Sequence, residues 1–134
     1  MIKTTNVYVV WNGCILLIQR TWKDENLPLY WESPAGHVDV SCPTGDSPLS
    51  RSEALRELHE ETGISASTHQ LVYLPQFSNN RHSSYLLWCR SVLPPKVTLS
   101  FEHDAFRWYS LAQPIRVRNV RPEVLHFIRS YRNA

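Results

Sequence analysis

The opening residues alternate two apolar runs around a polar turn, and this pattern predicts a β-hairpin. Apolar residues, many of them β-branched, fill most of 4–11 and 14–18, and Asn12-Gly13 separates the two runs. Both residues of that pair tolerate positive φ angles, which a two-residue hairpin turn requires. A polar loop follows, with a short strand expected near residues 30–31 and a turn at 34–36 that ends in a glycine.

The next pattern predicts one helix, preceded by turn-forming residues over 40–50. Two starting points are open for this helix. Ser50 and Glu53 have the S-x-x-E spacing of a capping box, whereas Ser47-Pro48 offers a start one turn earlier. Gly63 suits the C-terminal cap, because glycine readily adopts the left-handed conformation found there.

Four further elements are expected in the second half of the chain. Two strands should lie within 69–77 and 84–92, although Pro75 weakens the first or places it at a sheet edge. A last strand is expected at 105–111, and 122–132 has the amphipathic spacing of a closing helix. The order of elements predicts an α+β fold with a mixed sheet and helices packed on it.

Length and composition are those of one globular domain, residues 1–134, large enough for its own core. Neither a membrane-length apolar run nor a basic-then-apolar leader is present, so we expect a cytoplasmic protein without a membrane partner. Three cysteines without CxxC spacing argue against a disulfide framework or a cysteine-rich zinc site.

Charge is distributed unevenly along the chain. Residues 24–61 hold nine acidic residues against two arginines, whereas residues 105–134 hold six arginines against Glu123. This asymmetry suggests an acidic cation site beside a basic surface that could meet phosphates, although arginines on a final helix are more often a solvated face.

The predicted central helix concentrates acidic residues on one side. At about 100° per residue, four glutamates fall within an arc of roughly 100°. Like charges three or four residues apart repel, so an exposed acidic face is one interpretation and a divalent-cation site is the other. Carboxylates are the ligands that Mg²⁺ and Mn²⁺ favour, and no histidine pair at ligand spacing favours zinc. These glutamates are Glu53, Glu57, Glu60 and Glu61.

Spacing within this helix favours the cation site. The segment RELHEETGI, residues 56–64, fits R-E-U-x-E-E-x-G-U at every specified position, where U is apolar. It resembles the signature of the Nudix (MutT-like) hydrolases, and the preceding PAGHVD is similar to the glycine-containing loop that opens that signature. The resemblance implies a Nudix-type α/β/α sandwich, with a mixed sheet between helices, and a divalent cofactor, Mg²⁺ or Mn²⁺.

The resemblance also implies roles for individual residues. Arg56 matches the arginine that orients the glutamates through a salt bridge, and the Gly36 carbonyl matches a backbone metal ligand. An acid before the last strand can be an additional metal ligand or base in this family, and Glu102 is a better match than Asp104. The matched metal-binding carboxylates, of which the first is also a candidate general base, are Glu57, Glu60 and Glu61.

The loop before the helix departs from the family pattern. The distance from Gly36 to Arg56 is six residues longer than the usual spacing allows, and Ala35 replaces the first glycine of a frequent Gly-Gly pair. Loop insertions cost little free energy, so we expect the helix and its glutamates to be retained. The course of the loop, and any role for Asp46 within it, stays open.

The resemblance implies hydrolysis of a diphosphate bond in a nucleoside diphosphate derivative. The first expectation is a nucleoside or deoxynucleoside triphosphate, giving the monophosphate and pyrophosphate. Alternatives are a dinucleoside polyphosphate, a nucleotide sugar or the 5′ end of an RNA; a nucleic-acid partner is not favoured, and a homodimer is left open. Candidate substrate contacts are Arg20 for phosphate, Trp31 for stacking and Asn119 for a base edge, each with an ordinary structural role as its alternative.

Overall fold

A computed structural model describes residues 3–39, 41–43, 45–114 and 116–132. The seven strands form one mixed sheet, in which β3-β2-β1-β6-β5 are neighbours, β4 also pairs with β1, and β7 with β2. Only the β1–β6 pairing is parallel among these. The strands are β1 (Lys3–Trp11), β2 (Cys14–Arg20), β3 (Trp31–Glu32), β4 (Ala35–Val38), β5 (Leu71–Tyr73), β6 (His82–Cys89) and β7 (His103–Ser110).

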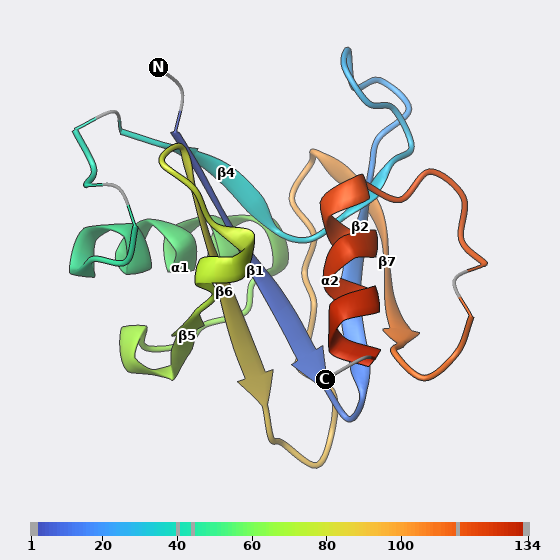
Figure 1. Ribbon diagram of the computed structural model, residues 1–134. Coiled ribbons are helices and arrows are strands. Elements are labelled where there is room, and N and C mark those ends of the chain that lie inside the picture. The colour runs from blue at the N-terminus through green and yellow to red at the C-terminus, as the bar shows by residue number, and fades with distance from the viewer. Residues whose placement is uncertain (1–2, 40, 44, 115, 133–134) are drawn as a thin grey trace.

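Two α-helices, α1 (Pro48–Thr62) and α2 (Pro122–Arg132), pack against the sheet (Figure 1). Alternate residues of β1 face different cores: Val7 and Val9 pack with Leu58 of α1, whereas Tyr8 packs with Phe127 of α2. A strand buried on both sides needs a continuous apolar run, and Val7 to Val10 of β1 provide one. The result is a sandwich with a helix on each face of the sheet, as predicted.

The local turn signals at the start of the chain and at the end of α1 are confirmed. Trp11 pairs with Cys14, and both Asn12 (φ 49°) and Gly13 (φ 72°) adopt the left-handed conformation of a two-residue hairpin turn. Gly63 caps α1 with φ 74°, and its N–H donates to His59 O at 2.8 Å.

Two expectations about local structure were wrong or incomplete. The predicted turn at 34–36 is instead the start of β4, because Asn6 to Lys3 of β1 pair with it along its whole length. The strand expected over 69–77 is only β5, and a short 3₁₀ helix, Pro75–Phe77, follows it.

Among the described residues, no helix is long and apolar enough to cross a membrane.

The start of α1 is the earlier of the two predicted alternatives. Ser47 is the N-cap, its hydroxyl accepts the Ser50 N–H at 3.0 Å, and the Ser50 hydroxyl accepts the Ser47 N–H at 3.0 Å. Glu53 is therefore not a capping residue; its carboxylate accepts from Arg56 at 2.6 Å. Pro48 occupies the first turn, where the missing N–H costs nothing.

Removing this cap should destabilise the protein. We expect Ser47→Ala to lower the free energy of unfolding by about 1 kcal/mol, because the start of α1 loses its hydrogen-bonded cap. Urea unfolding followed by circular dichroism would measure the change. Ser52→Ala, at an exposed position inside the same helix, is the matched control and should leave stability unchanged or slightly raised; equal midpoints for both variants would contradict the prediction.

Candidate metal and phosphate site

Arg56 joins three of the four glutamates of α1. Its guanidinium lies 2.6 Å from Glu53, 3.1 Å from Glu57 and 3.0 Å from Glu60, measured between the nearest nitrogen and oxygen atoms. The positive charge of Arg56 thus offsets the repulsion between carboxylates that lie a helical turn apart. Arg56 is half-exposed, so these pairs add little to stability and mainly fix where the carboxylates point.

The backbone of β4 lies directly against the carboxylates of α1. A Cβ atom added at Gly36 would lie 2.1 Å from Glu57 Cδ, a distance at which atoms clash. The neighbouring Ala35 N–H donates to Glu61 Oε1 at 2.8 Å. Gly36 is therefore brought beside Glu57, and a larger residue at this position would displace that carboxylate.

Of these carboxylates, Glu61 is buried and Glu57 is partly buried. Burial raises the pKa of Glu61 to about 8, with neighbouring Glu32, Glu57 and Glu102 adding to the effect and the Ala35 hydrogen bond opposing it. Burial likewise raises the pKa of Glu57, which Arg56 counteracts. A buried group of acids that resists ionisation is what a divalent cation would stabilise in its charged form.

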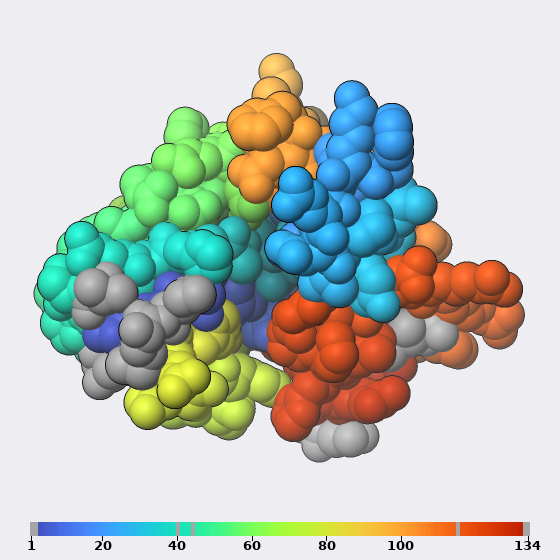
Figure 2. Space-filling view, turned by 90° about the horizontal axis from the view of Figure 1, so that it is seen from above, coloured from blue at the N-terminus to red at the C-terminus, as the bar shows by residue number. Residues whose placement is uncertain are grey.

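The segment before β7 lies beside the end of α1 and the loop after β2. Its backbone is hydrogen bonded to the end of α1, through Ser100 N to Glu61 O, and to the loop after β2, through Thr21 N to Glu102 O at 3.1 Å. Figure 2 shows these segments side by side on one face, α1 in green, the segment near residue 100 in orange and the loop after β2 in blue. Glu102 lies at the surface here, and its charge raises the pKa of both Glu57 and Glu61.

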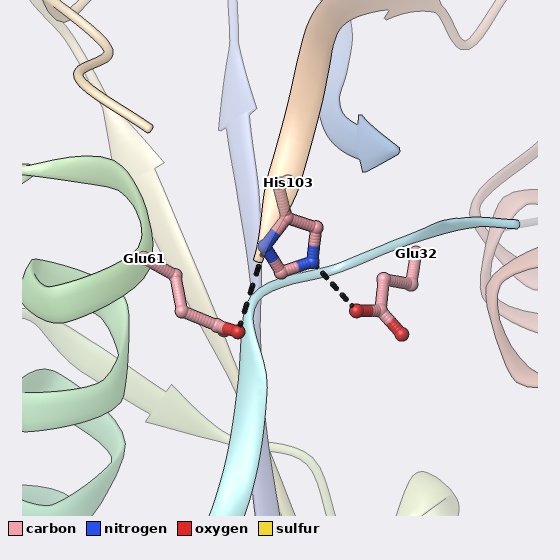
Figure 3. Close-up of side chains that lie close together, drawn as sticks. All are labelled: Glu32, Glu61 and His103. Atoms are coloured by element: carbon pink, nitrogen blue, oxygen red, sulfur yellow. Dashed lines mark hydrogen bonds and ion pairs between the residues drawn. The ribbon is translucent and has the colours of Figure 1, made fainter. Parts of the chain in front are cut away.

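The fold adds two residues that the sequence did not single out, Glu32 and His103 (Figure 3). His103 Nε2 lies 2.8 Å from Glu32 Oε2, and His103 Nδ1 lies 3.9 Å from Glu61 Oε2. Glu32 lies 71 residues before His103, so no sequence spacing connects them. They meet because β3 and β7 pair with opposite edges of the same end of β2.

Each of the three predicted substrate contacts already has a structural role in the fold. Arg20 donates to Glu32 at 2.9 Å and to Asp24 at 3.1 Å, so its charge is already paired. Trp31 is partly buried and packs against the core that includes α2. Its backbone N–H donates to the backbone oxygen of Asn119 at 2.8 Å. Asn119 has φ 58° and an exposed side chain, which are features of a turn residue.

Asp46, whose role was open, lies outside this group. It accepts two hydrogen bonds from Arg51, at 2.8 and 2.9 Å, and one from the Tyr85 hydroxyl at 3.1 Å. The hydrogen bond from Arg51 lowers the pKa of Asp46. The longer loop is thus tied to α1 and β6 by Asp46, and it leaves the glutamate face of the helix in place.

Comparison with known proteins decides the family. The family model of the NUDIX domain matches residues 3–131. The chain belongs to the Nudix family. This confirms the predicted hydrolase family and, with it, the predicted fold class.

Several curated proteins are similar to this Nudix chain. The asymmetrical bis(5′-nucleosyl)-tetraphosphatase of Rattus norvegicus is 36% identical over 91 residues, which cover 61% of this chain and 56% of the relative. Phosphatase NudJ of Shigella boydii is 29% identical over 126 residues, 90% of this chain and 76% of the relative. The match thus spans about half the length of the rat enzyme and three quarters of NudJ.

Solved structures share the Nudix fold. The MutT protein of Methanosarcina mazei superposes with a TM-score of 0.68 at 20% identity, over 98% of this chain and 93% of that protein. An Ap4A hydrolase of C. elegans gives a TM-score of 0.68 at 21% identity, over 99% and 96% of the two chains. At this level of identity the likeness concerns the fold alone.

The donor atoms of this Nudix site fit the cation that the family implies. Carboxylate oxygens and a backbone carbonyl suit a hard divalent ion such as Mg²⁺ or Mn²⁺. Glu57, Glu61 and the Gly36 backbone are in contact or linked through β4, and Arg56 ties Glu60 to Glu57. These residues would hold the ion, and the exposed Glu102, whose charge acts on Glu57 and Glu61, is a further candidate.

The burial of Glu61 predicts a pH dependence of stability without divalent ions. Its pKa is about 8 in the folded protein, against about 4.3 for an unfolded chain, so the stabilising proton is fully bound below the lower value and lost as pH rises through the higher one. In EDTA, wild type should therefore lose melting temperature relative to Glu61→Gln between about pH 5 and 8. Thermal unfolding followed by circular dichroism tests this, with Glu25→Gln, at an exposed position, as control for a lost charge; parallel curves for wild type and Glu61→Gln would contradict it.

Proposed function

We propose that this Nudix chain hydrolyses a diphosphate bond of a nucleotide with the help of Mg²⁺ or Mn²⁺. The observation that carries the proposal is the contact between the Glu57 carboxylate of α1 and the Gly36 backbone of β4, with Glu61 bound to the adjacent Ala35 N–H. This contact gathers carboxylates from a helix and a backbone segment from a strand around one point. Such a group of oxygen ligands serves phosphate chemistry, in which negative charge must be neutralised before water can attack.

Each residue then has a distinct task. A divalent ion bound here would neutralise phosphate charge and hold the diphosphate and the attacking water in line. Glu57, whose pKa is raised by burial, would accept the proton of the water, and Arg56 would hold Glu57 in the required direction. Glu60 and Glu61 would bind the ion together with the Gly36 carbonyl.

For the substrate we propose a nucleoside or deoxynucleoside triphosphate, cleaved to the monophosphate and pyrophosphate. In this proposal Trp31 and Asn119, which are linked by a backbone hydrogen bond, would border the base. A dinucleoside tetraphosphate is the second candidate. It is favoured by the name of the rat relative, an asymmetrical bis(5′-nucleosyl)-tetraphosphatase, which shares 36% identity over the matched segment.

A substrate panel tests both candidates. Purified protein would be incubated with nucleoside triphosphates, dinucleoside tetraphosphates, nucleotide sugars and a 5′-triphosphate RNA, each with Mg²⁺, with Mn²⁺ or with EDTA. Ion-exchange chromatography of the products identifies the bond that is broken. We expect turnover of at least one nucleotide that stops in EDTA; metal-independent turnover, or none with any member of the panel, would refute the proposal.

A further inference from the structure

The ring of His103 has an unused nitrogen inside the molecule. The side chain is 2% exposed, and in the described part of the chain Nδ1 is a buried polar atom without a hydrogen-bond partner. The nearest acidic oxygen, Glu61 Oε2, is 3.9 Å away, which is too far for a hydrogen bond in either protonation state of the ring. Buried polar atoms are rarely left unpaired, so a missing partner points to a ligand.

The other ring nitrogen of His103 is fixed. Nε2 lies 2.8 Å from Glu32 Oε2, so it carries the proton and donates it to that carboxylate. Glu32 is held in turn by Arg20, whose Nε donates to Glu32 Oε1 at 2.9 Å. The tautomer that results leaves a lone pair on Nδ1, directed at Glu61 (Figure 3).

Glu61 is fixed in the same way on the opposite side. Its Oε1 accepts the Ala35 N–H at 2.8 Å, and its Oε2 faces His103 Nδ1. Whereas the charge of Glu32 is offset by Arg20, Glu61 faces a neutral lone pair. Two electron donors thus face each other across a gap that two metal–ligand bonds of about 2.0–2.2 Å each can span in a bent arrangement.

We propose that His103 Nδ1 and Glu61 Oε2 bind a divalent transition-metal ion, and that Glu32 orients the imidazole for it. The arrangement is that of a carboxylate–histidine–metal triad, in which the second ring nitrogen donates to a carboxylate and the first binds the ion. Ligand atoms from Glu32, Glu61 and His103 all lie within 4.8 Å of one another. The inference rests on the proposed function only in that Glu61 would serve both this position and the oxygen site on α1.

A nitrogen ligand makes this position selective. Imidazole binds Mn²⁺, Co²⁺ and Zn²⁺ better than Mg²⁺, which prefers oxygen and retains its water. The position should therefore be filled by Mn²⁺, Co²⁺ or Zn²⁺, while Mg²⁺ uses the carboxylates near Arg56. A preference of the enzyme for Mn²⁺ over Mg²⁺ would follow from this one histidine.

The test is direct binding of Mn²⁺ without nucleotide. Electron spin-echo envelope modulation of the Mn²⁺-loaded protein should show coupling to a coordinated ¹⁴N in wild type and in His69→Gln, which alters an exposed histidine. The coupling should be absent in His103→Gln. Loss of coupling in the control, or its absence from wild type, would overturn the proposal.

A second variant keeps the proposal testable if His103→Gln does not fold. Glu32→Gln retains the ring but loses the carboxylate that fixes its tautomer, so Mn²⁺ affinity measured by calorimetry should fall by about 10- to 100-fold. Mg²⁺ affinity should change far less, and equal losses for the two ions would overturn the assignment. Because neither measurement uses a substrate, failure of the nucleotide panel does not affect them, and hydrolysis without ¹⁴N coupling would refute this inference alone.

Discussion

Gly36→Ala is expected to reduce nucleotide hydrolysis by about 100-fold or more while leaving the protein folded. The added methyl group would lie 2.1 Å from Glu57 Cδ and 2.4 Å from both carboxylate oxygens. These atoms are the free end of a flexible side chain, so Glu57 can rotate away without movement of α1 or β4. The strain is thereby relieved at a small cost in stability, but the carboxylate leaves the position from which it would bind the ion and the water.

A double-mutant cycle isolates this cause. If Gly36→Ala acts by displacing Glu57, it should lower kcat little further in a Glu57→Gln background, where that carboxylate no longer serves as base. Urea unfolding of the single variant should show a loss of no more than about 1–3 kcal/mol, the range for a modest overpacking. Additive effects on kcat, or global unfolding of Gly36→Ala, would contradict this explanation.

Local sequence signals identified most of the elements because each depends on neighbouring residues. The pair Asn12-Gly13 and the cap at Gly63 need positive φ angles, and the sequence supplies residues that adopt them. The glutamates of α1 share a face because helical geometry alone places them there. The resemblance of residues 56–64 to the Nudix signature then sufficed to predict the family.

Features that depend on pairing between distant segments could not be predicted in this way. β4 begins with Ala35-Gly36 directly after Pro34, a combination that suggests a turn, and it is a strand because β1 offers it hydrogen bonds. Glu53 has capping-box spacing, but Ser47 and Ser50 already satisfy the helix start, and Arg56 attracts the carboxylate instead. Which of two plausible hydrogen-bond partners a residue binds depends on contacts made elsewhere in the fold.

The position of His103 illustrates the same limit within the candidate site. A lone histidine predicts nothing by itself, and Glu32 belongs to a segment that was expected to be a polar loop with a short strand near residues 30–31. The pairing of β3 and β7 with β2 brings the two residues together, and the hydrogen bond of Ser100 to the end of α1 keeps Glu61 beside them. A ligand set drawn from three separate elements is therefore visible only in the folded chain.

Glu57→Gln is expected to have the largest effect on activity, a loss of about 10²- to 10⁴-fold in kcat, because it removes both a negative ligand and the proposed proton acceptor. Glutamine has nearly the same size, so packing against Gly36 is retained and stability should change little. Steady-state kinetics with saturating Mg²⁺ would measure the loss, and circular dichroism would verify the fold. Binding of Mg²⁺ should weaken in the same variant, which calorimetry can follow without substrate.

Glu53→Gln provides the matched control on the same helix. Both carboxylates contact the same nitrogen of Arg56, at 2.6 Å for Glu53 and 3.1 Å for Glu57, so each substitution loosens that arginine. Only Glu57 also lies against the backbone of Gly36, where the ion is expected. If the site acts through Glu57 itself, kcat of Glu53→Gln should stay within about threefold of wild type, because Arg56 keeps its contacts with Glu57 and Glu60 in that variant. Equal losses in the two variants would instead mean that both act through Arg56, and an active Glu57→Gln would refute its role as base.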